Sequence, residues 1–200
     1  MKGICCAKPF HYLSCLMEQM DEDIQLVERY LKGDAEAVEV LVMKYQKRIY
    51  AIAYRMTRDV EDAKDLTQKT FIKAIEGIRG FRRESSFKTW IYRIAINTSL
   101  THLKGNRREE RELDESIMGS HDGTLSTIIE NEKRDFIRRE LDGLPERQRL
   151  AVILRAYEGL NCSETAQIMG CSEGAVKAHY HHGVKRLKEI IKEKGYEVRA

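Results

Sequence analysis

Residues 160–188 read LNCSETAQIMGCSEGAVKAHYHHGVKRLK, and this stretch predicts two short helices joined by a tight turn. Asn161 and Glu164 have capping-box spacing, in which each side chain satisfies a backbone N–H at the start of the first helix. Gly170 lets the chain leave that helix with a positive φ, and Ser172 is a suitable N-cap for the second. A turn of about three residues between two helices is typical of the helix-turn-helix motif.

The second helix of this motif has two distinct faces. Its apolar face consists of Val176, Tyr180, Val184, Leu187 and Ile191. Its basic face consists of Lys177, His181, Lys185, Lys188 and Lys192. The apolar spacing predicts packing against the rest of a helical domain. The basic face belongs either to a helical hairpin with solvated lysines or to a recognition helix that lies in the DNA major groove, and the pattern favours the recognition helix.

Residues 21–105 contain no proline and carry frequent helix-boundary signals. A first helix ends at Gly33, a second runs from its cap at Asp34 to about Met56, a third runs from Asp59 to about Gly77, and a fourth runs from Phe87 to Lys104 after a cap at Ser85 or Ser86. The residues between the last two helices, 78–86, are predicted to form a loop. We expect the second helix to bury Ala37, Val40, Leu41, Tyr45, Ile49, Ile52 and Ala53. These elements predict a compact all-helical bundle.

Two further segments complete the predicted organisation. Residues 106–131 are polar, with little periodicity, and read as a flexible acidic linker. Beyond it the sequence predicts two helices broken at 143–145, with Leu150, Ile153, Leu154 and Tyr157 available to pack. The fold class is therefore all-α, with two helical domains over 21–105 and 132–194 joined by a flexible linker, and the helix-turn-helix lies in the C-terminal domain.

Charge is distributed unevenly along the chain. The 200 residues carry a formal net charge of +3, which is too small to indicate nucleic acid by itself. Residues 81–108 nevertheless contain seven Arg or Lys against Glu84 alone, whereas residues 109–135 contain nine Asp or Glu against three basic residues. No apolar run approaches the roughly 18 residues that a membrane span needs, and the N-terminus makes a poor signal peptide. We therefore expect a cytoplasmic protein.

Residues 1–20 differ in composition from the rest of the chain. They hold three of the five cysteines, and Cys5, Cys6, His11 and Cys15 offer ligand types that zinc accepts. No C-x-x-C pair anchors such a site, so a disordered extension is the preferred interpretation, with Met17 or Met20 as the hypothetical physiological start. The odd number of cysteines favours reduced thiols. We expect no metal and no cofactor.

Aromatic and basic residues alternate in the fourth predicted helix and in the loop before it. Arg93 and Asn97 are four residues apart and share a helix face. Aromatic rings stack on unpaired bases, and nearby cations neutralise phosphate. Trp90 is therefore either a base-stacking residue or a core anchor, and the sequence leaves both open. The charges of the loop at 81–83 do not fit a core.

Two blocks of the chain resemble the extracytoplasmic-function group of bacterial sigma factors. They are DLTQKTFIKA (65–74) followed by FRRESSFKTWIYRIAIN (81–97), and LPERQRLAVILRAYEGLNCSETAQIMGCSEGAVK (144–177). The resemblance extends over about residues 21–188. It implies a non-catalytic subunit that joins core RNA polymerase and directs it to promoters, with sigma domain 2 over 21–105 and sigma domain 4 over 132–194. An anti-sigma factor is an implied partner, and no direct membrane insertion is expected.

The same resemblance implies three sets of contact residues. Asp65, Gln68 and Phe71 match positions that dock on core polymerase. Phe81, Arg82, Arg83, Lys88, Trp90, Arg93 and Asn97 match positions that capture and read the melted -10 element. Arg155, Ser172, Lys177, Ala178, His181, His182 and Lys185 match or adjoin positions that face the -35 element.

The chain departs from the family pattern at several of these positions. Family members commonly have Arg where this chain has His179 and His182, and usually Gly at Arg83. A neutral imidazole contributes little of the phosphate attraction of a guanidinium, so the -35 contact is expected to be weaker or pH-sensitive. The alternative function is a helix-turn-helix regulator that binds duplex DNA without polymerase. An enzyme would have to rest on Cys162 and Cys171, neither of which has a sequence-local activating arrangement, or on His179, His181 and His182. These histidines either bind a metal or line a DNA-facing helix, and the DNA-facing helix is the preferred interpretation, so no catalytic residue is predicted.

Overall fold

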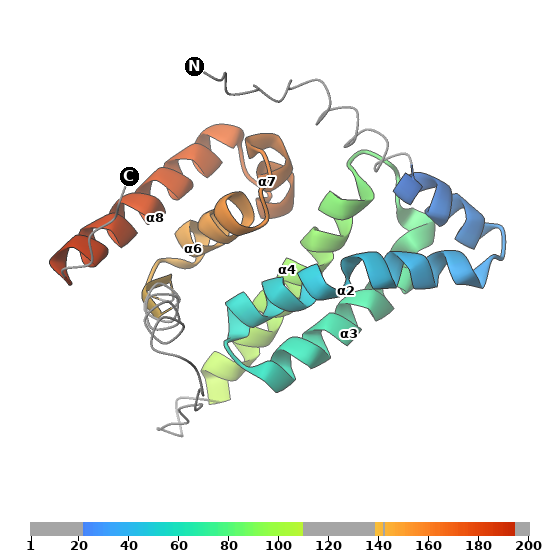
Figure 1. Ribbon diagram of the computed structural model, residues 1–200, viewed down its shortest axis with the longest axis horizontal. Helices are drawn as coiled ribbons and strands as arrows, with labels where there is room; N and C mark the ends of the chain where they lie inside the picture. The colour runs from blue at the N-terminus through green and yellow to red at the C-terminus, as the bar shows by residue number, and fades with distance from the viewer. Residues whose placement is uncertain (1–21, 110–138, 142, 195–200) are drawn as a thin grey trace, which may run out of the picture. The chain divides into compact units, whose positions relative to one another are not determined.

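A computed structural model describes residues 22–109, 139–141 and 143–194 of the chain. In chain order it contains a helix over 22–31, then α2 (Ala35–Thr57), α3 (Val60–Gly77), the 3-10 turn η1 (Ile78–Gly80), α4 (Phe87–Glu109), α6 (Glu146–Val152), the π-helical turn η2 (Ile153–Tyr157), α7 (Cys162–Met169) and α8 (Glu173–Glu193) (Figure 1). The described residues contain no strand. They divide into two compact units, the first built mainly from helix 22–31, α2, α3 and the first half of α4. The all-α prediction is therefore confirmed.

The helices of the first unit begin at the predicted caps. The Asp34 carboxylate accepts a hydrogen bond from the Glu36 backbone N–H at 3.1 Å, and the Asp59 carboxylate accepts one from the Asp62 N–H at 2.8 Å. At the start of α4 the Ser86 hydroxyl accepts from the Thr89 N–H at 3.1 Å, which settles the choice between the two serines. These bonds satisfy backbone donors that have no partner within the helix.

The core of the first unit is formed by α2, α3 and α4; α2 and α3 lie side by side in Figure 1, and α4 runs at an angle to both. Its largest fully buried side chains include Leu41, Ile49 and Ile52 of α2, Leu66 of α3, and Ile91, Tyr92 and Ile96 of α4. Burial of such side chains stabilises a fold by about 1.5–3 kcal/mol each. No described helix is long and apolar enough to cross a membrane.

Three predictions for the first unit need correction. Val40 is 45% exposed, because it precedes Leu41 by one residue and is therefore rotated by about 100° from the buried face of α2. Residues 78–80 form the turn η1, in which Ile78 is buried, so the predicted loop shortens to 81–86. The fourth helix continues to Glu109, five residues beyond its predicted end at Lys104.

The second unit contains the helix-turn-helix with the predicted boundary signals. Asn161 and Glu164 form a reciprocal capping box, with N–H to side-chain distances of 2.8 and 2.9 Å. Gly170 ends α7 with φ 60°, and the Ser172 hydroxyl accepts from the Ala175 N–H at the start of α8. The turn between the helices is thus the three residues 170–172.

α8 packs closely on α6 at one glycine. A Cβ atom placed on Gly183 would lie 2.9 Å from Val152 Cγ2 and 3.3 Å from the Gln148 carbonyl oxygen. The hydrophobic core beside this crossing contains Leu141, Leu144, Val152 and Leu187, with Tyr180 and Val184 partly buried against it. Gly183 therefore sets how closely the two helices approach.

The π-helical turn η2 changes one predicted core position. Leu150, Ile153 and Leu154 are buried as expected, but Tyr157 is 43% exposed. The π-helical turn is wider than an α-helical one, so Tyr157 rotates off the buried face that α-helical spacing from Leu154 would give it.

Candidate nucleic-acid and polymerase interface

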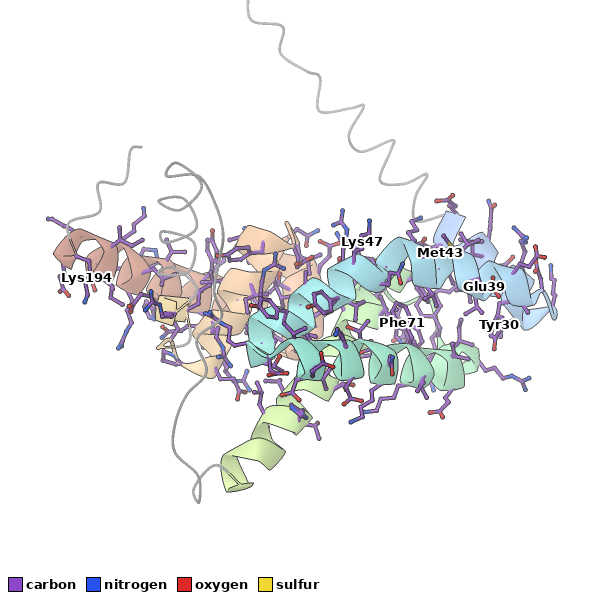
Figure 2. All side chains as sticks on the ribbon, turned by 60° about the horizontal axis from the view of Figure 1, so that its bottom comes forward. Tyr30, Glu39, Met43, Lys47, Phe71 and Lys194 are labelled. Atoms are coloured by element: carbon purple, nitrogen blue, oxygen red, sulfur yellow. The ribbon has the colours of Figure 1, made fainter. Side chains whose placement is uncertain are left out.

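The three residues predicted to dock on polymerase lie together on α3. Gln68 is exposed, and Asp65 and Phe71 are partly buried. The Asp65 carboxylate pairs with Lys69 Nζ at 2.6 Å one turn later, on the same exposed surface. Figure 2, in which Phe71, Met43 and Lys47 are labelled, shows α2 and α3 running side by side along this part of the unit. The surface presents polar, charged and aromatic groups within two turns of one helix.

An aromatic cluster joins the loop at 81–86 to the start of α4. The ring centroids of Phe81 and Trp90 are 5.2 Å apart, those of Phe87 and Trp90 are 5.5 Å apart, and those of Phe81 and Phe87 are 5.8 Å apart. Phe87 is buried, whereas Phe81 and Trp90 keep part of their surface exposed. Trp90 is therefore a packing residue that also offers an accessible ring surface.

The polar and basic residues of the predicted -10 surface belong to the same loop and helix as this cluster. Arg82, Arg93 and Asn97 are all exposed. Lys88 Nζ lies 5.8 Å from the centroid of the Tyr92 ring. The combination of cations, an amide and accessible aromatic surface matches what a single-stranded nucleic acid requires.

Arg83 differs from its neighbours in backbone conformation and in its partner. Its φ is 60°, in the left-handed region that glycine adopts most readily. Its Nη2 atom pairs with Glu28 Oε1 of helix 22–31 at 2.6 Å. The guanidinium of this predicted DNA contact is thus already engaged within the unit.

The predicted -35 residues of α8 present a continuous exposed surface. Ser172, Lys177, Ala178, His181, His182 and Lys185 are all exposed, as are Lys188 and Lys192 further along. The rings of His181 and His182 lie 6.0 Å apart, centroid to centroid. Val176 is fully buried at the other face, as the apolar spacing predicts. The helix therefore anchors one face in the core and turns a basic face outward.

Arg155 lies on the π-helical turn rather than on an open surface. Its Nη1 donates to the Leu160 carbonyl oxygen at 3.1 Å, and its guanidinium carbon lies 5.5 Å from the centroid of the Tyr180 ring. These contacts connect Leu160, two residues before α7, to Tyr180 of α8. Arg155 is partly buried, and its side chain links the segment just before the helix-turn-helix to α8.

Residues outside the predicted set also contribute to these surfaces. Glu28 contacts Arg83 of the loop and Phe87 contacts Phe81, and neither belongs to the predicted -10 contact set. Glu28 is 55 positions from its partner, and no local pattern signals such a pairing. Among the described residues, no group of three or more His, Cys, Asp or Glu is placed to hold a metal ion. The cysteines at positions 5, 6 and 15 lie outside the described residues.

Comparisons with known proteins show the family to which the chain is similar. The chain matches the family models of Sigma-70 region 2 over residues 41–109 and Sigma-70, region 4 over residues 136–187. It is 37% identical over 189 residues to RNA polymerase sigma-H factor of Pseudomonas aeruginosa, covering 88% of this chain and 94% of that protein. It is 34% identical over 190 residues to ECF RNA polymerase sigma-E factor of Escherichia coli, covering 90% of this chain and 96% of that protein.

Two solved structures have a similar fold. The sigma factor RpoE from Bartonella quintana, solved in complex with the anti-sigma factor NepR, matches with a TM-score of 0.64 and 25% identity, over 77% of this chain and 96% of that chain. CnrH, solved in complex with the cytosolic domain of CnrY, matches with a TM-score of 0.66 over 86% of this chain and 98% of that chain. At 19% identity, the second likeness shows the fold alone.

The chain belongs to the extracytoplasmic-function group of the sigma-70 family of bacterial RNA polymerase sigma factors. Its function is that of a sigma factor, which directs RNA polymerase to promoters and so initiates transcription. Proteins of this family are not, in general, enzymes.

Proposed function

We propose that the two exposed surfaces divide promoter recognition between them, the first unit reading the melted -10 element and α8 contacting the -35 element. The observation that carries this proposal is the aromatic cluster of Phe81, Phe87 and Trp90 next in sequence to exposed Arg82 and Arg93. Such a surface suits unpaired bases, whereas the exposed basic face of α8 suits a duplex groove.

The -10 surface comprises Phe81, Arg82, Arg83, Lys88, Trp90, Arg93 and Asn97. Extruding a base costs a few kcal/mol of stacking, and each aromatic stacking contact returns about 1–3 kcal/mol. The partly exposed rings of Phe81 and Trp90 supply such contacts. Asn97, which is exposed on the same helix, supplies hydrogen-bonding groups for a base edge.

The -35 surface comprises Arg155, Ser172, Lys177, Ala178, His181, His182 and Lys185. Lys177 and Lys185 lie on the exposed basic face of α8 and neutralise phosphate.

Core polymerase docks on Asp65, Gln68 and Phe71 of α3. The proposed domains are 21–105 and 132–194, with an extension over 1–20 and an acidic linker, predicted over 106–131, whose start moves to 110 because α4 continues to Glu109. The matched family segments support this division.

We assign the protein to the cytoplasm, where core polymerase acts, and assign it no enzymatic activity. An anti-sigma factor is its proposed inhibitor, which the complex of Bartonella quintana RpoE with NepR supports. Such a protein would compete with polymerase or with promoter DNA for one of the surfaces above.

In vitro transcription with core polymerase on a genomic library tests whether the two surfaces have these separate roles in promoter recognition. We expect initiation at a defined promoter class, lost with Gln68→Ala because polymerase docking fails. Asn97→Ala should reduce promoter opening with duplex binding intact, and Lys177→Ala should weaken binding to a -35 duplex. Stable operator binding by the free chain without polymerase-dependent initiation would support the helix-turn-helix regulator instead.

A further inference from the structure

We propose that helix 22–31 is a brace for the loop at 81–86, and that Glu28 and Arg83 are a coupled pair of positioning residues for reading the -10 base. This inference rests on the proposed function of that loop. It changes the role of Arg83 from a DNA contact to an internal support, and it gives a role to a helix that the sequence did not connect with promoter recognition.

The backbone of Arg83 requires support. A residue with a side chain at φ 60° is uncommon, because this backbone conformation is strained for residues other than glycine. The 2.6 Å ion pair with Glu28 holds the side chain on helix 22–31 while the backbone keeps this conformation. The pair therefore ties the middle of the loop to a helix 55 positions earlier.

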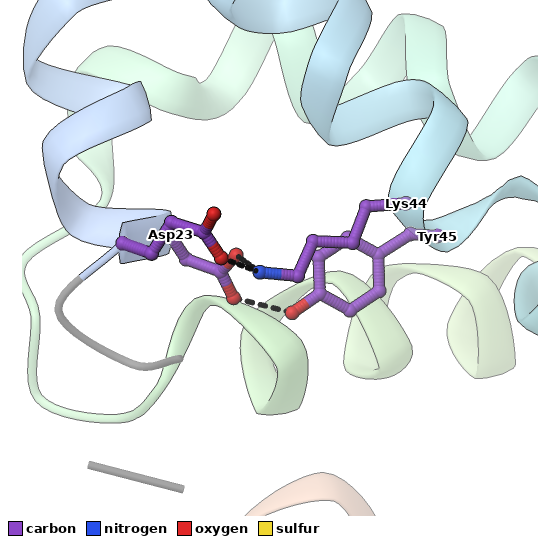
Figure 3. A network of polar contacts seen from close by, with 4 residues as sticks. Asp23, Lys44 and Tyr45 are labelled. Carbon is purple, nitrogen blue, oxygen red and sulfur yellow. Dashed lines mark hydrogen bonds and ion pairs between the residues drawn. The ribbon is translucent and has the colours of Figure 1, made fainter. Parts of the chain in front are cut away.

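The helix that carries Glu28 is itself anchored to α2. Asp23, which is 4% exposed, accepts hydrogen bonds from the Tyr45 hydroxyl and from Lys44 Nζ, the latter at 2.7 Å (Figure 3). Glu22 adds a second 2.7 Å bond to the same lysine. Burial lowers the pKa of Lys44, but its bonds to Asp23 and Glu22 raise it by more, so the ammonium stays charged. Burial and the bond to Asp23 raise the pKa of Tyr45, so its hydroxyl keeps the donated proton.

The same anchor reaches the other end of the loop through aromatic contacts. The Tyr45 ring lies 5.6 Å from the Phe87 ring, and Phe87 is the first residue of α4. Phe87 in turn contacts Phe81 at the start of the loop. Helix 22–31 thus restrains the middle of the loop directly, through Glu28, and both ends indirectly, through Asp23 and Tyr45.

A restrained loop presents its base-contacting residues without a further loss of conformational entropy on binding. Loss of the Glu28 pair should leave the chain folded and able to bind polymerase, but should weaken its discrimination at the -10 position. For a half-exposed ion pair, the expected reduction in discrimination is about twofold to fivefold.

The test uses polymerase reconstituted with the full chain, on two promoters that differ only at the captured -10 base. The ratio of their open-complex formation rates is measured for the wild type, Glu28→Gln, Arg83→Gln, the double variant, and the exchanged pair Glu28→Arg with Arg83→Glu. Arg29→Gln is the matched control, because Arg29 lies on the same helix as Glu28 but pairs at 2.7 Å with Asp34, the N-cap of α2, and not with the loop. Asn97→Ala is the reference for loss of base reading.

We expect both single variants to lower the ratio to a similar extent, the double variant to lower it no further, the exchanged pair to restore part of it, and Arg29→Gln to leave it unchanged. An increase in promoter opening with Glu28→Gln would overturn the brace, because it would mean that the freed guanidinium of Arg83 contacts phosphate. Additive losses in the double variant would overturn it as well.

Two further outcomes separate this inference from the function on which it rests. If Asn97→Ala lowers the ratio but Glu28→Gln does not, the brace is wrong and the assignment of the -10 surface stands. If Asn97→Ala leaves the ratio unchanged, the base-reading role of this surface is wrong, and the brace fails with it.

Discussion

The loop at 81–86 and the turn of the helix-turn-helix present the two candidate promoter surfaces, but different kinds of contact hold them in place. The loop depends on contacts between residues 22 and 55 positions apart, namely Asp23 with Tyr45 and Glu28 with Arg83. The turn depends on bonds between residues three to five positions apart, from Asn161 to Ala175. The first surface therefore needs the whole unit to be folded, whereas the second is largely specified by its own sequence.

The largest expected effect concerns the buried anchor of the first unit. Asp23→Ala should cost about 3 kcal/mol, because it leaves the buried Tyr45 hydroxyl and the Lys44 ammonium without their shared partner. Trp90, the only tryptophan, lies in this unit, so its fluorescence during denaturant unfolding measures the change. Glu22→Ala removes the other carboxylate that pairs with Lys44; the Glu22 side chain is 61% exposed, so its loss should cost less than about 1 kcal/mol. Equal losses for the two variants would show that burial does not distinguish these contacts.

The next effect tests whether local contacts alone position α8. Gly183→Ala should destabilise the second unit by about 1–2 kcal/mol, because overpacking against Val152 and the Gln148 carbonyl exceeds the gain in helix propensity. Gly174→Ala, on the same helix, would place its Cβ 3.9 Å from the Ser172 hydroxyl and should be neutral or stabilising. Thermal unfolding followed by circular dichroism compares them. If both variants have the same melting temperature and it lies above that of the wild type, the close approach of α8 to α6 at Gly183 does not limit stability.

A smaller effect should follow from the capping box. Asn161→Ala is expected to cost about 1 kcal/mol, since a backbone N–H of α7 loses its acceptor. Asn161→Asp keeps an acceptor at the same position and should retain most of the stability. The measurement is the denaturant midpoint of the second unit, and an unchanged midpoint for Asn161→Ala would contradict local specification of this turn.

The smallest expected effect is on binding rather than on stability. His182→Arg should tighten binding to a -35 duplex by about threefold, because a guanidinium carries a fixed charge and a fork of N–H donors that suit phosphate. Fluorescence anisotropy at fixed salt and neutral pH measures the affinity. Lys192→Arg, which keeps the charge at the far end of α8, is the control. Unchanged or weaker binding by His182→Arg would contradict the prediction.

The same contrast explains which features the sequence predicted. The sequence predicts features that depend on residues within one helical turn of each other. These are the caps at Asp34, Asp59 and Asn161 and the turn at Gly170. The pairing of Glu28 with Arg83 depends on how separate helices pack, and no local spacing encodes it. Val40 and Tyr157 are exposed where burial was predicted, because apolar character alone does not decide on which side of a helix a residue lies. For Tyr157, no sequence pattern signals the π-helical turn that moves it off the buried face.

The π-helical turn at Ile153–Tyr157 limits the insertions and deletions that this segment can accept during evolution. A π-helical turn holds one residue more than the α-helical turn that it replaces, so loss of one residue there would restore regular α-helix and change the direction in which the side chains of this turn point. Arg155 would then no longer reach both the Leu160 carbonyl and the Tyr180 ring. Insertions and deletions that a surface loop tolerates should therefore be selected against in this segment, even where single substitutions are accepted.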